Sequence, residues 1–106
     1  MASRVREVVW SESAQRALDE VIEYVANDSK SAAERVLHTA LDVAASLATL
    51  SERGRVVPEL DTPSIRELFV FEYRLMYRFE EARIVVVAFI HGARDFAAWR
   101  SERGLE

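Results

Sequence analysis

The stretch IRELFVFEYRLMYRFEEARIVVVAFIHGARD, residues 65–95, decides the fold because it contains three consecutive strand patterns. In residues 73–80 apolar side chains alternate with arginine, methionine or glutamate, which is the period of a strand with one buried face. Residues 84–90 are apolar throughout and mostly β-branched or aromatic, as expected for a strand covered on both faces. Such a strand lies inside a sheet, so it needs a neighbour on each side.

The N-terminal segment offers that second neighbour. Residues 5–10 read as a short strand, and no other segment is left to pair with the last one. Apolar side chains then recur at helical spacing from Ala14 to Val25, which predicts a helix capped by Ser11 or Ser13 and ending near Asn27.

A second amphipathic helix follows after a few polar residues. Ser31 and Glu34 have the spacing of a capping box, which predicts the start of this helix, and Gly54 is placed to end it. Two helices joined so closely form an antiparallel hairpin. Residues 55–64, with two prolines, are expected to be the one long loop, and residues 96–104 a short terminal helix.

The expected fold is therefore α+β with element order β-α-α-β-β-β in a single domain, residues 1–106. The two-helix hairpin packs on one face of a mostly antiparallel four-stranded sheet with spatial order 1-4-3-2.

One turn between the predicted antiparallel strands is unusual. Phe71 and Glu72 follow the second strand, and neither adopts positive φ cheaply, so a loop wider than two residues, or a bulge, is expected there.

Composition limits the classes of function. Half of the residues are hydrophobic and 30% are charged, as in ordinary soluble domains, and no apolar run approaches the roughly 20 residues of a membrane helix. The chain has no cysteine, which excludes disulfides and thiolate metal sites, and we expect no metal and no cofactor. A net charge of -4 argues against non-specific coating of nucleic acid. A cytoplasmic protein is the simplest interpretation.

Several short motifs occur in a characteristic order along this framework. They are Gly54-Arg55, Arg66-Glu67-Leu68, Tyr73-Arg74, Tyr77-Arg78 and His91-Gly92-Ala93-Arg94-Asp95. Together with the strand and helix order, they make the chain resemble the RelE/ParE superfamily, the toxin halves of bacterial type II toxin–antitoxin pairs, over about residues 5–96. The resemblance implies a toxin that arrests growth and is neutralised by a cognate antitoxin, whose tail wraps the toxin in extended and helical segments.

The resemblance also implies two possible activities. The RelE-like branch cuts mRNA in the ribosomal A site without a metal, and Glu59, Arg66 and His91 match its acidic, arginine and histidine members. In that interpretation Glu59 is the base, Arg66 clamps the phosphate and His91 is the acid or a positioning group. The ParE-like branch poisons DNA gyrase. Gly92, where a ribonuclease often has an aromatic residue, and the acidic net charge favour this second branch.

Each candidate residue also has a purely structural interpretation. His91 could be a strand-end histidine bonded to a backbone carbonyl, and Glu59 a solvated loop carboxylate. Arg66 and Glu67 point to opposite faces of one strand, where they could form cross-strand ion pairs.

A surface for substrate or antitoxin is expected from the remaining arginines. Arg74 and Arg78 share one face of their strand, opposite the tyrosines, so they should point outward, and Arg94 follows the last strand. Tyr73 and Tyr77 are expected in the core. The interpretation favoured here is a gyrase-directed toxin. The alternatives are a metal-independent, ribosome-dependent endoribonuclease and an inactive domain that only binds antitoxin, in each case with possible homo- or hetero-oligomers.

Overall fold

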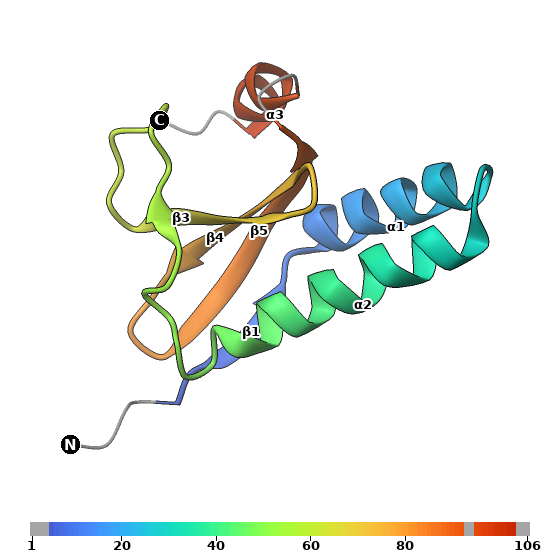
Figure 1. The fold of residues 1–106 in the computed structure, drawn as a ribbon. Coiled ribbons are helices and arrows are strands. Elements are labelled where there is room, and N and C mark those ends of the chain that lie inside the picture. The colour runs from blue at the N-terminus through green and yellow to red at the C-terminus, as the bar shows by residue number, and fades with distance from the viewer. Residues whose placement is uncertain (1–4, 93–94, 104–106) are drawn as a thin grey trace.

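The computed structural model describes residues 5–92 and 95–103. Its elements, in order, are β1 (Glu7–Trp10), α1 (Glu12–Ala26), α2 (Lys30–Ser46), β2 (Arg55–Val56), β3 (Ile65–Val70), β4 (Tyr73–Phe79), β5 (Arg83–His91) and α3 (Phe96–Arg103). The helices α1 and α2 lie side by side as an antiparallel hairpin, and α3 lies apart from them beyond the end of β5 (Figure 1). None of the described helices is long and apolar enough to cross a membrane.

The sheet has five strands in the order β1-β5-β4-β3-β2. β1 pairs with β5 in parallel, and every other pair is antiparallel. The four expected strands thus lie side by side in the predicted spatial order. The prediction of a four-stranded sheet is wrong, because a fifth strand is present. The fifth strand, β2, has only two residues, and they pair with Arg66 and Glu67 inside the segment expected to be a loop. Two residues are too few to show a strand period.

The helix boundaries correct two predictions and confirm two, one of which is the end of α1, whose C-cap is Asn27. Ser11 caps α1, accepting a hydrogen bond from the Ala14 N–H at 3.1 Å, as predicted. The cap of α2 is Ser29 rather than Ser31. The Ser29 hydroxyl accepts a hydrogen bond from the N–H of Ala32, three residues further along, which is the usual spacing of a helix cap. α2 also ends at Ser46, eight residues before Gly54, so Gly54 does not terminate it.

Two hydrophobic layers cover the sheet, and β5 contributes to both of them. On the helix side Ile84, Val86 and Phe89 pack with side chains of α1, α2, Tyr73 and Tyr77, which confirms that both tyrosines lie in the core. On the other side the buried cluster consists of Val57, Leu60, Ile65, Met76, Val85, Val87, Ala88, Phe96 and Trp99. The second layer therefore comes from the segment after β2 and from α3. Its presence explains why β5 carries no polar face.

The β3–β4 turn is tighter than expected. Val70 pairs with Tyr73, so only Phe71 and Glu72 connect the strands, and the expectation of a wider or bulged loop is wrong. Phe71 has a φ of 57°, in the left-handed region that side chains with a Cβ rarely adopt. Phe71 is 55% exposed, so burial of its side chain does not offset the backbone cost.

Replacing Phe71 with glycine should stabilise the protein. The left-handed backbone costs a residue with a Cβ roughly 1–2 kcal/mol, and the extra freedom of glycine in the unfolded chain cancels about half of the gain. We therefore expect Phe71→Gly to raise the free energy of unfolding by about 0.5–1 kcal/mol, measured by urea denaturation. Phe71→Ala removes the same ring but keeps the Cβ, so an equal gain in that variant would contradict the explanation.

Candidate functional site

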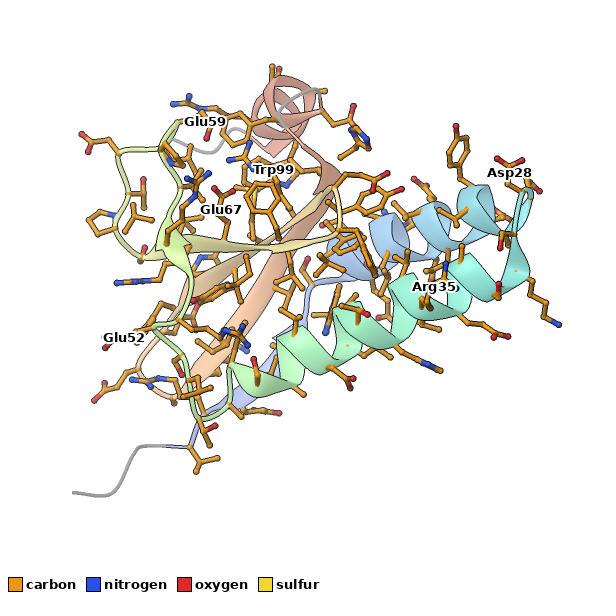
Figure 2. All side chains as sticks on the ribbon, in the orientation of Figure 1. Asp28, Arg35, Glu52, Glu59, Glu67 and Trp99 are labelled. Carbon is orange, nitrogen blue, oxygen red and sulfur yellow. The ribbon has the colours of Figure 1, made fainter. Side chains whose placement is uncertain are left out.

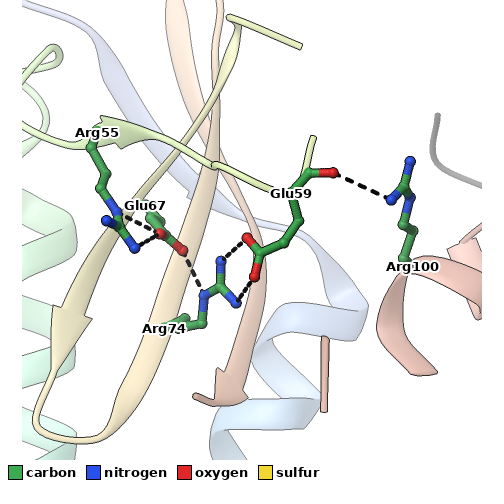
Figure 3. A network of polar contacts seen from close by, with 5 residues as sticks. All are labelled: Arg55, Glu59, Glu67, Arg74 and Arg100. Atoms are coloured by element: carbon green, nitrogen blue, oxygen red, sulfur yellow. Dashed lines mark hydrogen bonds and ion pairs between the residues drawn. The ribbon is translucent and has the colours of Figure 1, made fainter. Parts of the chain in front are cut away.

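A network of charged side chains lies on the face of the sheet opposite the α1–α2 hairpin (Figure 3). The Arg74 guanidinium donates from Nε to Glu67 at 2.6 Å and from Nη1 and Nη2 to the two carboxylate oxygens of Glu59 at 3.0 and 2.7 Å. Arg55 donates to the other oxygen of Glu67 at 2.7 Å. Two arginines and two glutamates thus neutralise each other in a chain of charge-assisted hydrogen bonds.

Arg74 is buried, so its expected outward position is wrong. Its relative exposure is 3%, and the Glu67 side chain beside it is fully buried. The face is covered because α3 and the loop that carries Glu59 lie over it. The Phe96 ring stands 5.0 Å from the guanidinium carbon of Arg74, and Arg100 donates to the Glu59 backbone carbonyl at 3.3 Å. The period-2 pattern identifies the face of a strand but not what later segments place over it.

The hydrogen bonds from Arg74 lower the pKa of Glu59 below its ordinary value of 4.5, although partial burial acts in the opposite direction. A carboxyl group with a lowered folded pKa stabilises the protein above its unfolded pKa, and this contribution is lost as the pH falls through the folded pKa. We expect Glu59→Gln to make the fall in stability below about pH 4.5 shallower than in the wild type. Urea denaturation of both proteins between pH 3 and 7 measures the free energy of unfolding at each pH. Identical pH profiles would show that the ion pair contributes nothing.

Arg66 lies on the opposite face of the sheet from Glu59. Its Nη1 donates to the backbone carbonyls of Gly54 at 2.9 Å and Glu52 at 3.4 Å, and its guanidinium carbon lies 5.7 Å from the centre of the Phe79 ring. Its neighbour Glu67 points to the other face, into the Arg74 network, as the alternation along β3 predicts.

His91, at the end of β5, lies far from Arg66 along the sheet. It pairs in register with Tyr73, whose ring it meets edge-on at 5.6 Å, and its Nε2 is 4.0 Å from a Glu72 carboxylate oxygen. Its Nδ1 finds no hydrogen-bond partner within residues 5–92 and 95–103. Arg66 instead pairs with Tyr77, four residues further along β4, which is a separation of roughly 13 Å at 3.3 Å per residue.

Two candidates remain, Arg78 and Arg94. Arg78 is 40% exposed on its side chain and pairs with Glu80 at 3.6 Å, so it lies at the surface as expected. Arg94 lies outside the described residues. Among the residues that the structure describes, no group of three or more His, Cys, Asp or Glu side chains is arranged to hold a metal ion.

Comparison with known proteins identifies the family to which the chain belongs. A family model described as the ParE toxin of the type II toxin–antitoxin system parDE matches residues 8–96. The chain belongs to this ParE family. It is thus a type II toxin of the ParE type, and the RelE/ParE resemblance is confirmed. No curated protein sequence matches it.

A solved structure supports the same fold. The chromosomal ParDE toxin–antitoxin system from P. aeruginosa contains a chain that matches this ParE toxin with a TM-score of 0.69 at 17% sequence identity. The match covers 85% of this toxin and 99% of that chain. At this identity the likeness concerns the arrangement of helices and strands.

The site contains groups to which the sequence patterns assigned no role in it. The Tyr77 hydroxyl donates to the Ser51 carbonyl at 2.7 Å and accepts from the Gly54 N–H at 3.0 Å, which fixes the chain just before β2. Arg55 completes the charge of the Arg74 network (Figure 3). The Gly54-Arg55 pair is one of the motifs that mark the sequence, but nothing in the sequence shows which strand this pair approaches.

Proposed function

We propose that this ParE-type toxin arrests growth by blocking DNA gyrase, not by cutting mRNA, and that a cognate antitoxin neutralises it in the cytoplasm. The observation that carries the proposal is the separation of the ribonuclease candidates. Glu59 and Arg66 lie on opposite faces of the sheet. Family membership supports the same conclusion, since the matching model describes the ParE branch.

The chemistry of RNA cleavage explains why this separation matters. A metal-independent ribonuclease needs a base, an acid and a cation within hydrogen-bond reach of one ribose and its phosphate. Here both carboxylate oxygens of Glu59 are bound by Arg74, which lowers its pKa and weakens it as a base. His91 belongs to the far end of β5. These three side chains serve the structure of the toxin in our proposal.

Two assays on the purified toxin test this proposal. We expect the wild type to inhibit supercoiling by DNA gyrase and to leave ribosome-bound mRNA intact. His91→Ala should inhibit gyrase as the wild type does, because the histidine has no catalytic role in this proposal. Cleavage of ribosome-bound mRNA by the wild type, abolished in Arg66→Ala and in His91→Ala, would overturn it. Circular dichroism of each variant controls for unfolding.

The antitoxin part of the proposal has its own test. A short reading frame beside this gene should encode the antitoxin, and co-expression should yield a stable complex and restore growth. A toxin that binds this product, yet neither arrests growth nor inhibits gyrase, would be an inactive antitoxin-binding domain of the same fold.

A further inference from the structure

Phe71 occupies a position where an aromatic side chain lowers the stability of the fold. Its backbone has a φ of 57°, and the residue is 55% exposed at the turn between β3 and β4. Glycine adopts this backbone without the cost that a Cβ brings. Residues held in such sparsely populated conformations cluster at ligand-binding sites and switch regions. The outlier at Phe71 therefore points to a contact that the ring makes outside the folded chain.

A second exposed ring lies near this turn. Tyr24, on α1, is 74% exposed. Two hollows of about 550 and 240 Å³ share Glu72 and Tyr73 in their walls. The larger hollow also lies against Tyr24, and the smaller one lies against Phe71 and the exposed Arg35 of α2. Exposed aromatic rings and an arginine beside a recess are the composition of an interface centre. The side chains of Tyr24, Arg35 and Phe71 form the turn patch.

The exposed face of α1, which carries Tyr24, is acidic. Four exposed carboxylates lie on α1 against the single arginine Arg16, namely Glu12, Asp19, Glu20 and Glu23. None of the ion pairs within residues 5–92 and 95–103 includes any of these four side chains. This face therefore complements a partner that presents basic side chains.

The acidic charge selects among the possible occupants. A second copy of this chain would bring two acidic faces together, and DNA would bring its phosphates against one, so both are disfavoured. An enzyme that binds DNA presents lysine and arginine side chains to the phosphates, so part of its surface is basic. DNA gyrase, the target in the proposed function, is such an enzyme.

We propose that the turn patch is the surface through which the toxin contacts DNA gyrase, with the Phe71 ring at its centre. The ring enters an apolar recess of the gyrase surface, and the carboxylates of α1 meet basic side chains around that recess. The left-handed turn lowers the stability of the toxin and presents the ring to this partner. The inference deepens the proposed function and rests on it, because gyrase is the partner in both.

Inhibition of gyrase supercoiling by variants of Phe71 tests the inference. We expect Phe71→Gly to raise the toxin concentration that halves supercoiling by about tenfold or more. Since the same variant should be more stable than the wild type, unfolding cannot explain this loss. Phe71→Tyr keeps the ring and should stay within about threefold of the wild type. Phe69→Ala removes another exposed ring, one that shares a face of β3 with Glu67, and should stay within about twofold.

The possible outcomes separate this inference from the proposed function. If the wild type inhibits gyrase and Phe71→Gly inhibits it equally well, the turn patch is not the contact surface, although the proposed function stands. The inference is also wrong if Phe71→Gly still inhibits gyrase but loses affinity for the antitoxin, measured by calorimetry. If the wild type does not inhibit gyrase, the proposed function fails and this inference falls with it.

A matched pair of charge reversals tests the electrostatic part of the inference. Glu23→Lys and Asp42→Lys change the net charge equally at exposed helix positions, but only Glu23 lies on α1, beside Tyr24. We expect Glu23→Lys to raise the half-inhibiting toxin concentration by about fivefold or more, and Asp42→Lys, on α2, to stay within about twofold of the wild type. Equal effects of the two reversals would overturn the assignment of the α1 face to gyrase.

Discussion

Replacing Arg74 with alanine is expected to lower the free energy of unfolding by about 3–5 kcal/mol, because a buried ion pair that loses one partner leaves an uncompensated charge. Glu67, which is fully buried, would keep only Arg55, itself 60% exposed on its side chain. Glu59 would lose both of its hydrogen bonds from the guanidinium. Figure 2 shows Glu59, Glu67 and Trp99 at the same end of the molecule. Because Arg74 binds Glu59 and contacts the Phe96 ring of α3, its loss also loosens the Glu59 loop and α3.

Denaturation with guanidinium chloride measures this loss of stability. Two further variants show whether the loss comes from the buried ion pairs. Arg78→Ala removes an arginine from the same strand at a 40% exposed position, so it should cost less than about 1 kcal/mol. Arg74→Met combined with Glu67→Leu removes both buried charges and should recover much of the stability. If Arg74→Ala and Arg78→Ala cost the same, the network does not stabilise the fold.

Replacing Gly54 with alanine is expected to cost about 1–3 kcal/mol, because it overpacks a closed site. A Cβ at Gly54 would lie 2.6 Å from the Tyr77 hydroxyl oxygen and 2.8 Å from the Glu67 carbonyl oxygen. Real Cβ atoms do not make such contacts, so the ring or the chain before β2 has to move. The hydrogen bonds of the Tyr77 hydroxyl to Gly54 and Ser51 would be lost in that movement.

Thermal denaturation in two backgrounds separates the collision from other effects of the substitution. Tyr77→Phe removes the hydroxyl that the new Cβ approaches most closely. Gly54→Ala should therefore cost less in the Tyr77→Phe background than in the wild type, since residues in contact do not contribute independently. An equal cost in both backgrounds would show that the Tyr77 hydroxyl is not what excludes a side chain at Gly54.

Most of the fold could be predicted from the sequence, because long elements repeat their pattern. The apolar run of β5 indicated a strand covered on both faces, and the neighbouring strands followed from it. The failures were local. β2 is too short to show a period. The turn at Phe71 adopts a backbone that its side chain disfavours, which the rest of the hairpin imposes through the pairing of Val70 with Tyr73.

The site was harder to predict because it depends on which segments meet over a sheet face. Alternation correctly separated Arg66 from Glu67. It could not show that α3 and the Glu59 loop would cover Arg74, since both lie outside the strand that carries the arginine. The resemblance to family motifs grouped Glu59, Arg66 and His91 as one candidate ribonuclease site. Tertiary structure placed them on different faces and at different ends of the sheet.

The most direct test of this account is inhibition of gyrase supercoiling by the Glu59→Gln toxin. Glutamine keeps the shape of the side chain and one acceptor for Arg74 but cannot act as a base. If Glu59 is a structural partner of Arg74, the variant should inhibit supercoiling at the same concentration as the wild type. A folded Glu59→Gln toxin that no longer inhibits gyrase would contradict the structural role assigned to this carboxylate.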